Sequence, residues 1–143
     1  PLTVVLAGPP GTAADLRMAR LSISGSWACV FATSLDGAPL DRSSRVLVGH
    51  LTDMRNTGQT FRDGSLEVLE SFGSAPRLVR AGTARVRLAR TAPLEAYRLA
   101  PDGSRAGRVR TAGGRDAVEF TASTATRPDA TLFYELAAPG SRP

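Results

Sequence analysis

Apolar and polar residues alternate along most of the chain, which is the pattern of β-strands that bury one face. The clearest example is residues 84–90, where Val86 and Leu88 alternate with arginines. The alternating segments are short, and turn-forming Gly, Pro, Asp or Ser residues separate them. About eight to eleven strands, with turns every 8–12 residues, predict an all-β chain folded as an antiparallel β-sandwich of immunoglobulin-like or jelly-roll-like type.

Four segments make this prediction more specific. Residues 15–24 alternate with a one-residue slip in their middle, which a bulge or two short strands would explain. Residues 44–54 are apolar on both faces, as in a strand that is buried on both sides. Residues 95–110 read as a strand, a Pro-Asp-Gly-Ser turn and a second strand, which predicts a hairpin. Residues 65–72 favour either a strand or a short helix, because their leucines lie three apart.

The length of 143 residues predicts one domain over residues 1–143, with a frayed tail at 137–143. The chain begins at Pro1, not at methionine, and we interpret it as a C-terminal fragment of a longer protein. Cys29 is the single cysteine, so an internal disulfide is excluded. No run of 18 apolar residues occurs, so the sequence predicts no membrane partner.

The charge pattern argues against nucleic-acid binding. The net charge is +5, and all 18 basic residues are arginines scattered among acidic residues. The densest basic run, residues 108–115, contains no aromatic side chain. Nucleic-acid binding sites combine a basic face with aromatic stacking platforms. We therefore expect no nucleic-acid partner, and we interpret most arginines as a solvated surface.

Candidate catalytic and metal-binding residues fail simple geometric tests. Ser43, His50 and Asp53 could be written as a hydrolytic triad, but residues three apart in one strand point to opposite faces. His50 is instead expected to be partly buried with a local hydrogen bond. One histidine and one cysteine cannot build a zinc site, and Asp36 and Asp41 fit a turn as well as a calcium loop. No pair of glutamates stands out at glycosidase spacing. The sequence therefore predicts no catalytic residue, no metal and no cofactor.

Aromatic side chains that could stack on a sugar are few. Trp27 and Tyr97 are the candidates for carbohydrate stacking, although both lie in apolar strands. For Trp27 the core is the favoured location, because large aromatic side chains dominate small β cores. For Tyr97 and Tyr134 we expect a ring in the core with its hydroxyl at the rim.

Three pieces of the sequence carry a family resemblance. They are SLDGAPLDRSSRVLVGHLTDMRNTGQTF at 34–61, GSAPRLV at 73–79, and AYRLAPDGSRAGRV at 96–109 followed by TLFYEL at 131–136. In this order and spacing they resemble the C-terminal β-sandwich accessory domain of large bacterial glycoside hydrolases, over about residues 24–136. The polar GHLTDMR and the terminal FYEL depart from the family pattern, where a less polar strand end and a Trp-Tyr pair are commoner.

The resemblance implies a non-catalytic domain that packs against the catalytic barrel of the same polypeptide. It implies an extracellular or periplasmic parent protein, and it carries over no catalytic residue. For ligand or domain contact we select the polar turn of Arg55, Asn56, Thr57 and Gln59, whose donors suit sugar hydroxyls. The alternatives are an autonomous carbohydrate-binding module, whose partner would be a polysaccharide, and an immunoglobulin-like protein-interaction domain.

Overall fold

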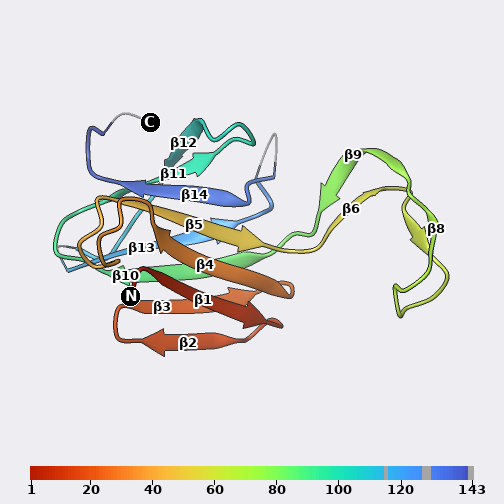
Figure 1. Ribbon diagram of the computed structural model, residues 1–143, viewed down its shortest axis with the longest axis horizontal. Helices are drawn as coiled ribbons and strands as arrows, with labels where there is room; N and C mark the ends of the chain where they lie inside the picture. Colours follow the sequence, from red (N-terminus) through yellow and green to blue (C-terminus); the bar gives the residue numbers. More distant parts are fainter. Residues whose placement is uncertain (115, 127–129, 142–143) are drawn as a thin grey trace.

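The computed structural model describes residues 1–114, 116–126 and 130–141, and all of its regular elements are β-strands. Six antiparallel strands form the larger sheet, in the order β1 (Thr3–Gly8), β4 (Ala28–Ser34), β5 (Arg45–Leu51), β14 (Phe133–Ala137), β11 (Glu95–Leu99) and β12 (Arg105–Val109). Four form the smaller sheet, in the order β13 (Ala117–Ser123), β10 (Thr83–Ala89), β3 (Ala19–Ser24) and β2 (Ala13–Leu16). The two sheets face each other as a β-sandwich, as predicted (Figure 1). The described residues include no helix long and apolar enough to cross a membrane.

The core lies between the two sheets and follows the alternation of the sequence. In β10, Val86 and Leu88 are fully buried while Arg85 and Arg87 face outward, which confirms a strand with one solvent-exposed face. One cluster of buried apolar residues joins both sheets. Its largest fully buried members are Tyr134, Leu21, Ile23, Leu40, Leu88 and Leu136.

β5 is buried on both sides in its middle, as the sequence predicts. It lies inside the larger sheet, hydrogen-bonded to β4 on one side and β14 on the other. Val46, Val48 and His50 face the core, and Gly49 is buried on the opposite face. Residues 95–110 form the predicted hairpin, in which β11 pairs with β12.

Two ambiguous segments are resolved by the structure. The slip in residues 15–24 separates two strands, β2 and β3, joined by a tight turn at 17–18. Residues 65–72 are not helical: Leu66 has a positive φ of 62°, and the short strand β8 (Leu69–Ser71) follows it. The described chain has fourteen strands, more than predicted, because several of them are only two to four residues long.

Buried polar contacts tie the sheets and loops together. The Tyr134 hydroxyl, in the larger sheet, donates to the Ser123 carbonyl at 2.7 Å and accepts from the Ser123 amide at 2.8 Å, in the smaller sheet. Arg90 is also buried, and its guanidinium donates to the carbonyls of Leu40 and Ser43. This arginine therefore anchors the loop between β4 and β5, and it does not belong to the solvated surface that the sequence suggested.

Candidate functional site

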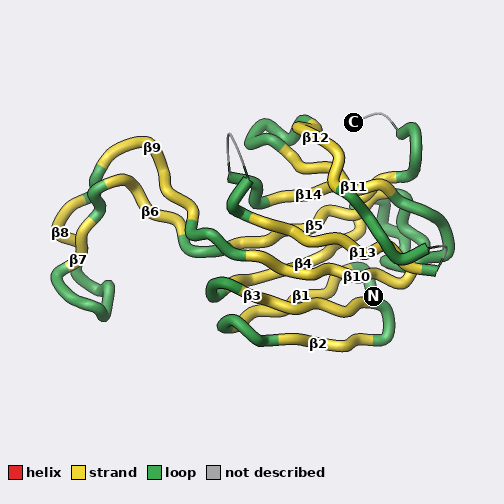
Figure 2. Tube along the Cα trace, turned by 180° about the vertical axis from the view of Figure 1, so that it is seen from behind, coloured by secondary structure: helices red, strands yellow, loops and turns green. Residues whose placement is uncertain are grey.

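The most unusual feature of the fold is a two-stranded arm, residues 54–79, that extends away from the sandwich (Figures 1 and 2). β6 (Met54–Thr57) pairs with β9 (Ser74–Val79), and the short strands β7 (Thr60–Phe61) and β8 continue toward the tip. β6 continues from β5 of the larger sheet, and β9 leads into β10 of the smaller sheet. The arm therefore projects from one end of the sandwich, and its two sides connect to a strand of each sheet.

The structure places the predicted polar turn of Arg55, Asn56, Thr57 and Gln59 on the arm. Asn56 Nδ2 donates to the Phe72 carbonyl at 2.9 Å, and Gln59 Oε1 accepts from the Asn56 amide at 3.0 Å. The Thr57 hydroxyl donates to the Pro76 carbonyl at 2.7 Å. The Asn56 and Thr57 side chains thus hold the two sides of the arm together, and Gln59 closes the turn beside them, so the first role of these polar groups is structural. Contact with a ligand or a neighbouring domain stays a prediction.

Large apolar side chains are exposed along the arm. Phe72 is 76% exposed, and Leu78 and Met54 are each about half exposed. Leu66 and Val68, near the tip, are exposed as well. Singly exposed apolar residues are ordinary on protein surfaces, but several on one slender extension are typical of an interaction surface.

A second apolar surface lies on the outer face of the larger sheet. Val5, Phe31, Gly49 and Phe133 are cross-strand neighbours and form one row across four strands. Val5 is 57% exposed and Phe133 is 38% exposed, and Phe31 is half-buried. We call this row and the adjoining Leu47 and Leu51 the outer apolar face. It is continuous with the arm, because β5 leads directly into β6.

Trp27 lies where the arm meets the sandwich, and its predicted location in the core was wrong. Its side chain is 58% exposed. Core positions in β4 begin at Ala28 and continue at Val30 and Ala32, which turns Trp27 to the outer side with Cys29 and Phe31. Because β4 is apolar on both faces, the sequence alone did not decide this orientation.

A hollow at the foot of the arm is lined by Trp27 together with polar side chains. Its other lining residues are Cys29, Leu51, Thr52, Asp53 and Arg80. Asp53 Oδ2 accepts from Arg55 Nε at 3.1 Å and from Arg80 at 3.3 Å. Two of the predicted candidates, Trp27 and Arg55, are thus brought to one place through Asp53.

Tyr97, the other stacking candidate, lies far along the larger sheet, on β11. The Arg105 guanidinium lies over its ring, 4.2 Å from the ring centroid, and its hydroxyl donates to Glu95 at 2.5 Å. The hydrogen bond to Glu95, together with burial, raises the pKa of the Tyr97 hydroxyl. The predicted location of this ring in the core was wrong, because its neighbour Ala96 takes the core position of β11 and Tyr97 turns to the outer face, where an arginine already occupies one face of the ring.

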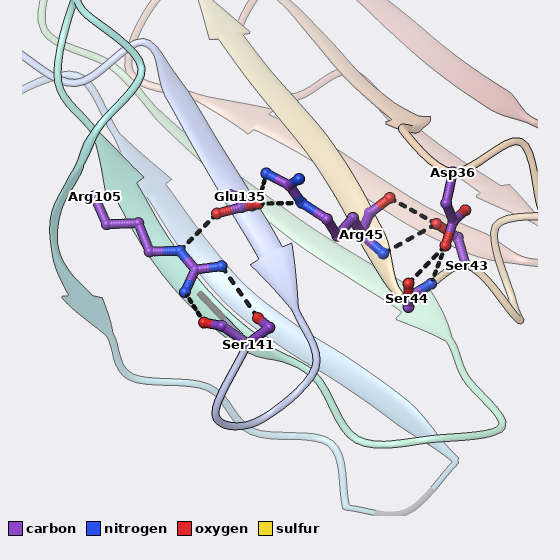
Figure 3. A network of polar contacts seen from close by, with 7 residues as sticks. All are labelled: Asp36, Ser43, Ser44, Arg45, Arg105, Glu135 and Ser141. Atoms are coloured by element: carbon purple, nitrogen blue, oxygen red, sulfur yellow. Dashed lines mark hydrogen bonds and ion pairs between the residues drawn. The ribbon is translucent and has the colours of Figure 1, made fainter. Parts of the chain in front are cut away.

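Beside Tyr97 the structure holds a buried carboxylate that the sequence did not single out (Figure 3). Glu135 is 3% exposed and lies between Arg105 Nε at 2.6 Å and Arg45 Nε at 2.7 Å. Arg105 also donates to the carbonyl of Ser141 at 2.5 Å, and Ala137 is a buried residue of β14, so the described part of the segment predicted as a frayed tail is held in place. Burial alone would raise the pKa of Glu135, but the hydrogen bonds from Arg105 and Arg45 outweigh it and lower the pKa. The group is a structural anion, held charged.

The residues weighed as a hydrolytic triad do not assemble. The Ser43 hydroxyl donates to the Arg45 carbonyl at 2.6 Å, and Asp53 pairs with arginines at the foot of the arm. His50 is completely buried, and neither ring nitrogen hydrogen-bonds to a described residue, so the expected partly buried histidine with a local hydrogen bond was wrong. Burial lowers the pKa of His50.

Metal ligands are also not gathered anywhere in the described part of the chain, where no group of three or more His, Cys, Asp or Glu side chains could hold an ion. In the loop that was considered for calcium, Asp36 accepts from the Ser44 amide at 2.6 Å and from the Ala38 amide at 3.2 Å. The hydroxyls of Ser43 and Ser44 help to lower the pKa of Asp36 far below its usual range. This carboxylate organises its own loop.

Comparison of the chain with protein-family models, with curated proteins and with solved structures finds no match. Three surfaces of the molecule are the candidates for a functional contact: the arm, the outer apolar face and the hollow at the foot of the arm.

Proposed function

We propose that the chain is a non-catalytic accessory domain of a carbohydrate-active enzyme, and that its arm and outer apolar face pack against the catalytic domain of the same polypeptide. The observation that carries the proposal is the arm itself. Asn56 and Thr57 hydrogen-bond across it, while Phe72, Leu78 and Met54 remain exposed. A two-stranded extension has no core of its own in which these side chains could be buried. They can be removed from water only by contact with a partner.

The arm and the outer apolar face suit one large partner better than two small ones. They adjoin each other through the direct passage from β5 to β6, and Trp27 and Leu51 lie at the junction. A protein partner seated on this junction would cover Phe31 and Phe133 on the sheet and Phe72 on the arm. Buried aromatic side chains of this kind dominate the binding energy of protein interfaces.

The assignment of the partner as a glycoside hydrolase barrel rests on the sequence resemblance. It covers the turn at 34–44, strand β5 and the polar turn on the arm. The resemblance carries over no catalytic residue to this domain. The catalytic carboxylates would belong to the partner domain.

The direct test is association between this chain and the domain that adjoins it in the parent polypeptide, produced as two separate proteins. Titration calorimetry should detect binding, and Phe72→Ser or Leu78→Ser should weaken it at least tenfold. Leu16→Ser is the control, because Leu16 is also an exposed apolar residue, at 43%, but lies on β2 of the smaller sheet. Absence of association, or an adjoining sequence without a barrel that carries paired carboxylates, would overturn the proposal.

A further inference from the structure

We propose that the hollow at the foot of the arm is a saccharide subsite, in which the Trp27 indole stacks on a sugar ring and Asp53 and Arg80 hydrogen-bond its hydroxyls. The proposal does not depend on docking to a catalytic domain. It concerns the hollow alone, which shares Leu51 with the outer apolar face, and it predicts that the 143-residue chain binds sugar by itself.

The shape of the hollow suits a small ring. Its volume is about 440 Å³, within the range of small-molecule sites. Cys29 and Leu51 are cross-strand neighbours and, together with Trp27, form the apolar part of its lining. A pyranose presents C–H groups on one face and hydroxyls around its edge. The exposed Trp27 indole and its apolar neighbours suit the C–H face of such a sugar ring. Polar side chains are then needed only around the edge of the ring, where its hydroxyls lie.

Asp53 and Arg80 supply those polar groups in a fixed arrangement. Both arginine contacts fall on Asp53 Oδ2, so Oδ1 makes no hydrogen bond within the described residues. Arg80 directs one terminal nitrogen to Asp53, and its side chain remains 56% exposed with further N–H groups to donate. An acceptor and a donor therefore lie side by side. Neighbouring sugar hydroxyls, each both donor and acceptor, fit such a pair.

The backbone around the pair is held firmly. The Arg80 amide donates to the Asp53 carbonyl at 2.8 Å, and the Thr52 hydroxyl donates to the Arg80 carbonyl at 2.7 Å. These bonds join the two chain segments that enter and leave the arm. Because the polar groups are ordered before a ligand arrives, little conformational entropy is lost when it binds.

Trp27 is the single tryptophan of the chain, so intrinsic fluorescence reports directly on this hollow. The chain should be titrated with cellohexaose, xylohexaose, mannohexaose and galacturonic acid hexamer. We expect a saturable shift of the emission with at least one of them, and at least fivefold weaker binding in Asp53→Asn. Phe72→Ser, on the arm but outside the hollow, should bind as the unmodified chain does.

Affinity electrophoresis of Trp27→Ala on the corresponding polysaccharide is the second measurement, because this exposed substitution leaves the ion pairs of the arm intact. We expect its retardation to be lost. No saturable fluorescence change with any of the four oligosaccharides, or undiminished retardation of Trp27→Ala, would overturn the subsite. Neither result bears on docking, which is measured without sugar.

Discussion

The ring of Phe31 lies directly over the backbone of Gly49 on the neighbouring strand. A Cβ atom at position 49 would lie 2.2 Å from Phe31 Cε1, far inside van der Waals contact. Because Gly49 has no side chain, the Phe31 ring packs against its backbone on the outer apolar face, in the same row as Val5 and Phe133. The glycine is required by this close approach of a side chain.

Gly49→Ala should therefore destabilise the fold by about 1–3 kcal/mol, because the added methyl group forces the Phe31 ring out of its position. In a Phe31→Ala background, Gly49→Ala should lower the free energy of unfolding by much less. Urea unfolding of the four proteins in this cycle measures the coupling between the two positions. An equal cost in both backgrounds would show that the ring does not depend on the glycine.

Tyr134→Phe should destabilise the protein by about 1–2 kcal/mol, because the phenol exchanges two hydrogen bonds with Ser123 of the facing sheet. The ring contact with Phe120 is retained in this variant. Tyr97→Phe is the matched control, since among the described residues its hydroxyl bonds only to Glu95, on the outer face. Thermal unfolding should show a clearly larger loss for Tyr134→Phe, and equal losses would contradict the role of the inter-sheet bonds.

Glu135→Gln should cost about 2 kcal/mol at pH 7, because two charge-assisted hydrogen bonds from Arg45 and Arg105 are weakened. The folded pKa of Glu135 is lowered, so its contribution is present above the unfolded value of about 4.3 and is lost as pH falls through the folded pKa. The variant should accordingly lose less stability than the unmodified protein on acidification below that value.

Glu119→Gln provides the comparison for this measurement. Glu119 pairs with Arg85 at 3.6 Å and with Arg87 at 3.9 Å at the surface, so its loss should cost less than about 1 kcal/mol. If both variants lost the same stability in denaturant titrations, Glu135 would not be the structural anion that its burial indicates.

His50→Leu should remove a pH dependence of the free energy of unfolding and change that free energy at pH 7.5 by less than about 1 kcal/mol. The reason is that it replaces a buried ring, whose nitrogens make no hydrogen bond to a described residue, by an apolar side chain. Burial lowers the folded pKa, so the unfolded chain binds the extra proton first as pH falls. Stability is full above the unfolded pKa of about 6.5 and declines below it.

Unfolding free energies at pH 5.5 and 7.5 test this directly, because His50 is the only histidine of the chain. The unmodified protein should be less stable at pH 5.5, and most of that difference should vanish in His50→Leu. An unchanged difference would assign the pH dependence to carboxylates elsewhere.

The all-β fold was predictable because alternation is a local signal. Val86 and Leu88 among arginines specify a one-sided strand whatever they pack against. Trp27 was not predictable, because both faces of its strand are apolar and only the register against β5 decides which face turns outward. The burial of Arg90 depends on carbonyls at Leu40 and Ser43, about 50 residues away in sequence.

The arm could not be predicted from the sequence for a related reason. Residues 66–72 and 77–79 alternate like other strands of the chain, and nothing in their pattern shows that their partners are residues 60–61 and 54–57 of the arm, away from the sandwich. The polar turn at Arg55–Gln59 was selected as a contact for a partner, and its position on the arm followed only from the pairing of β6 with β9.

The measurement that tests the proposed function most directly is amide hydrogen exchange in this chain alone and in the parent polypeptide that includes the adjoining domain. We predict at least tenfold slower exchange in the parent at the arm, residues 54–79, whose edges are open in the isolated sandwich, with β2 and β3 unchanged. Equal exchange of the arm in both proteins would contradict the claim that it packs against the catalytic domain.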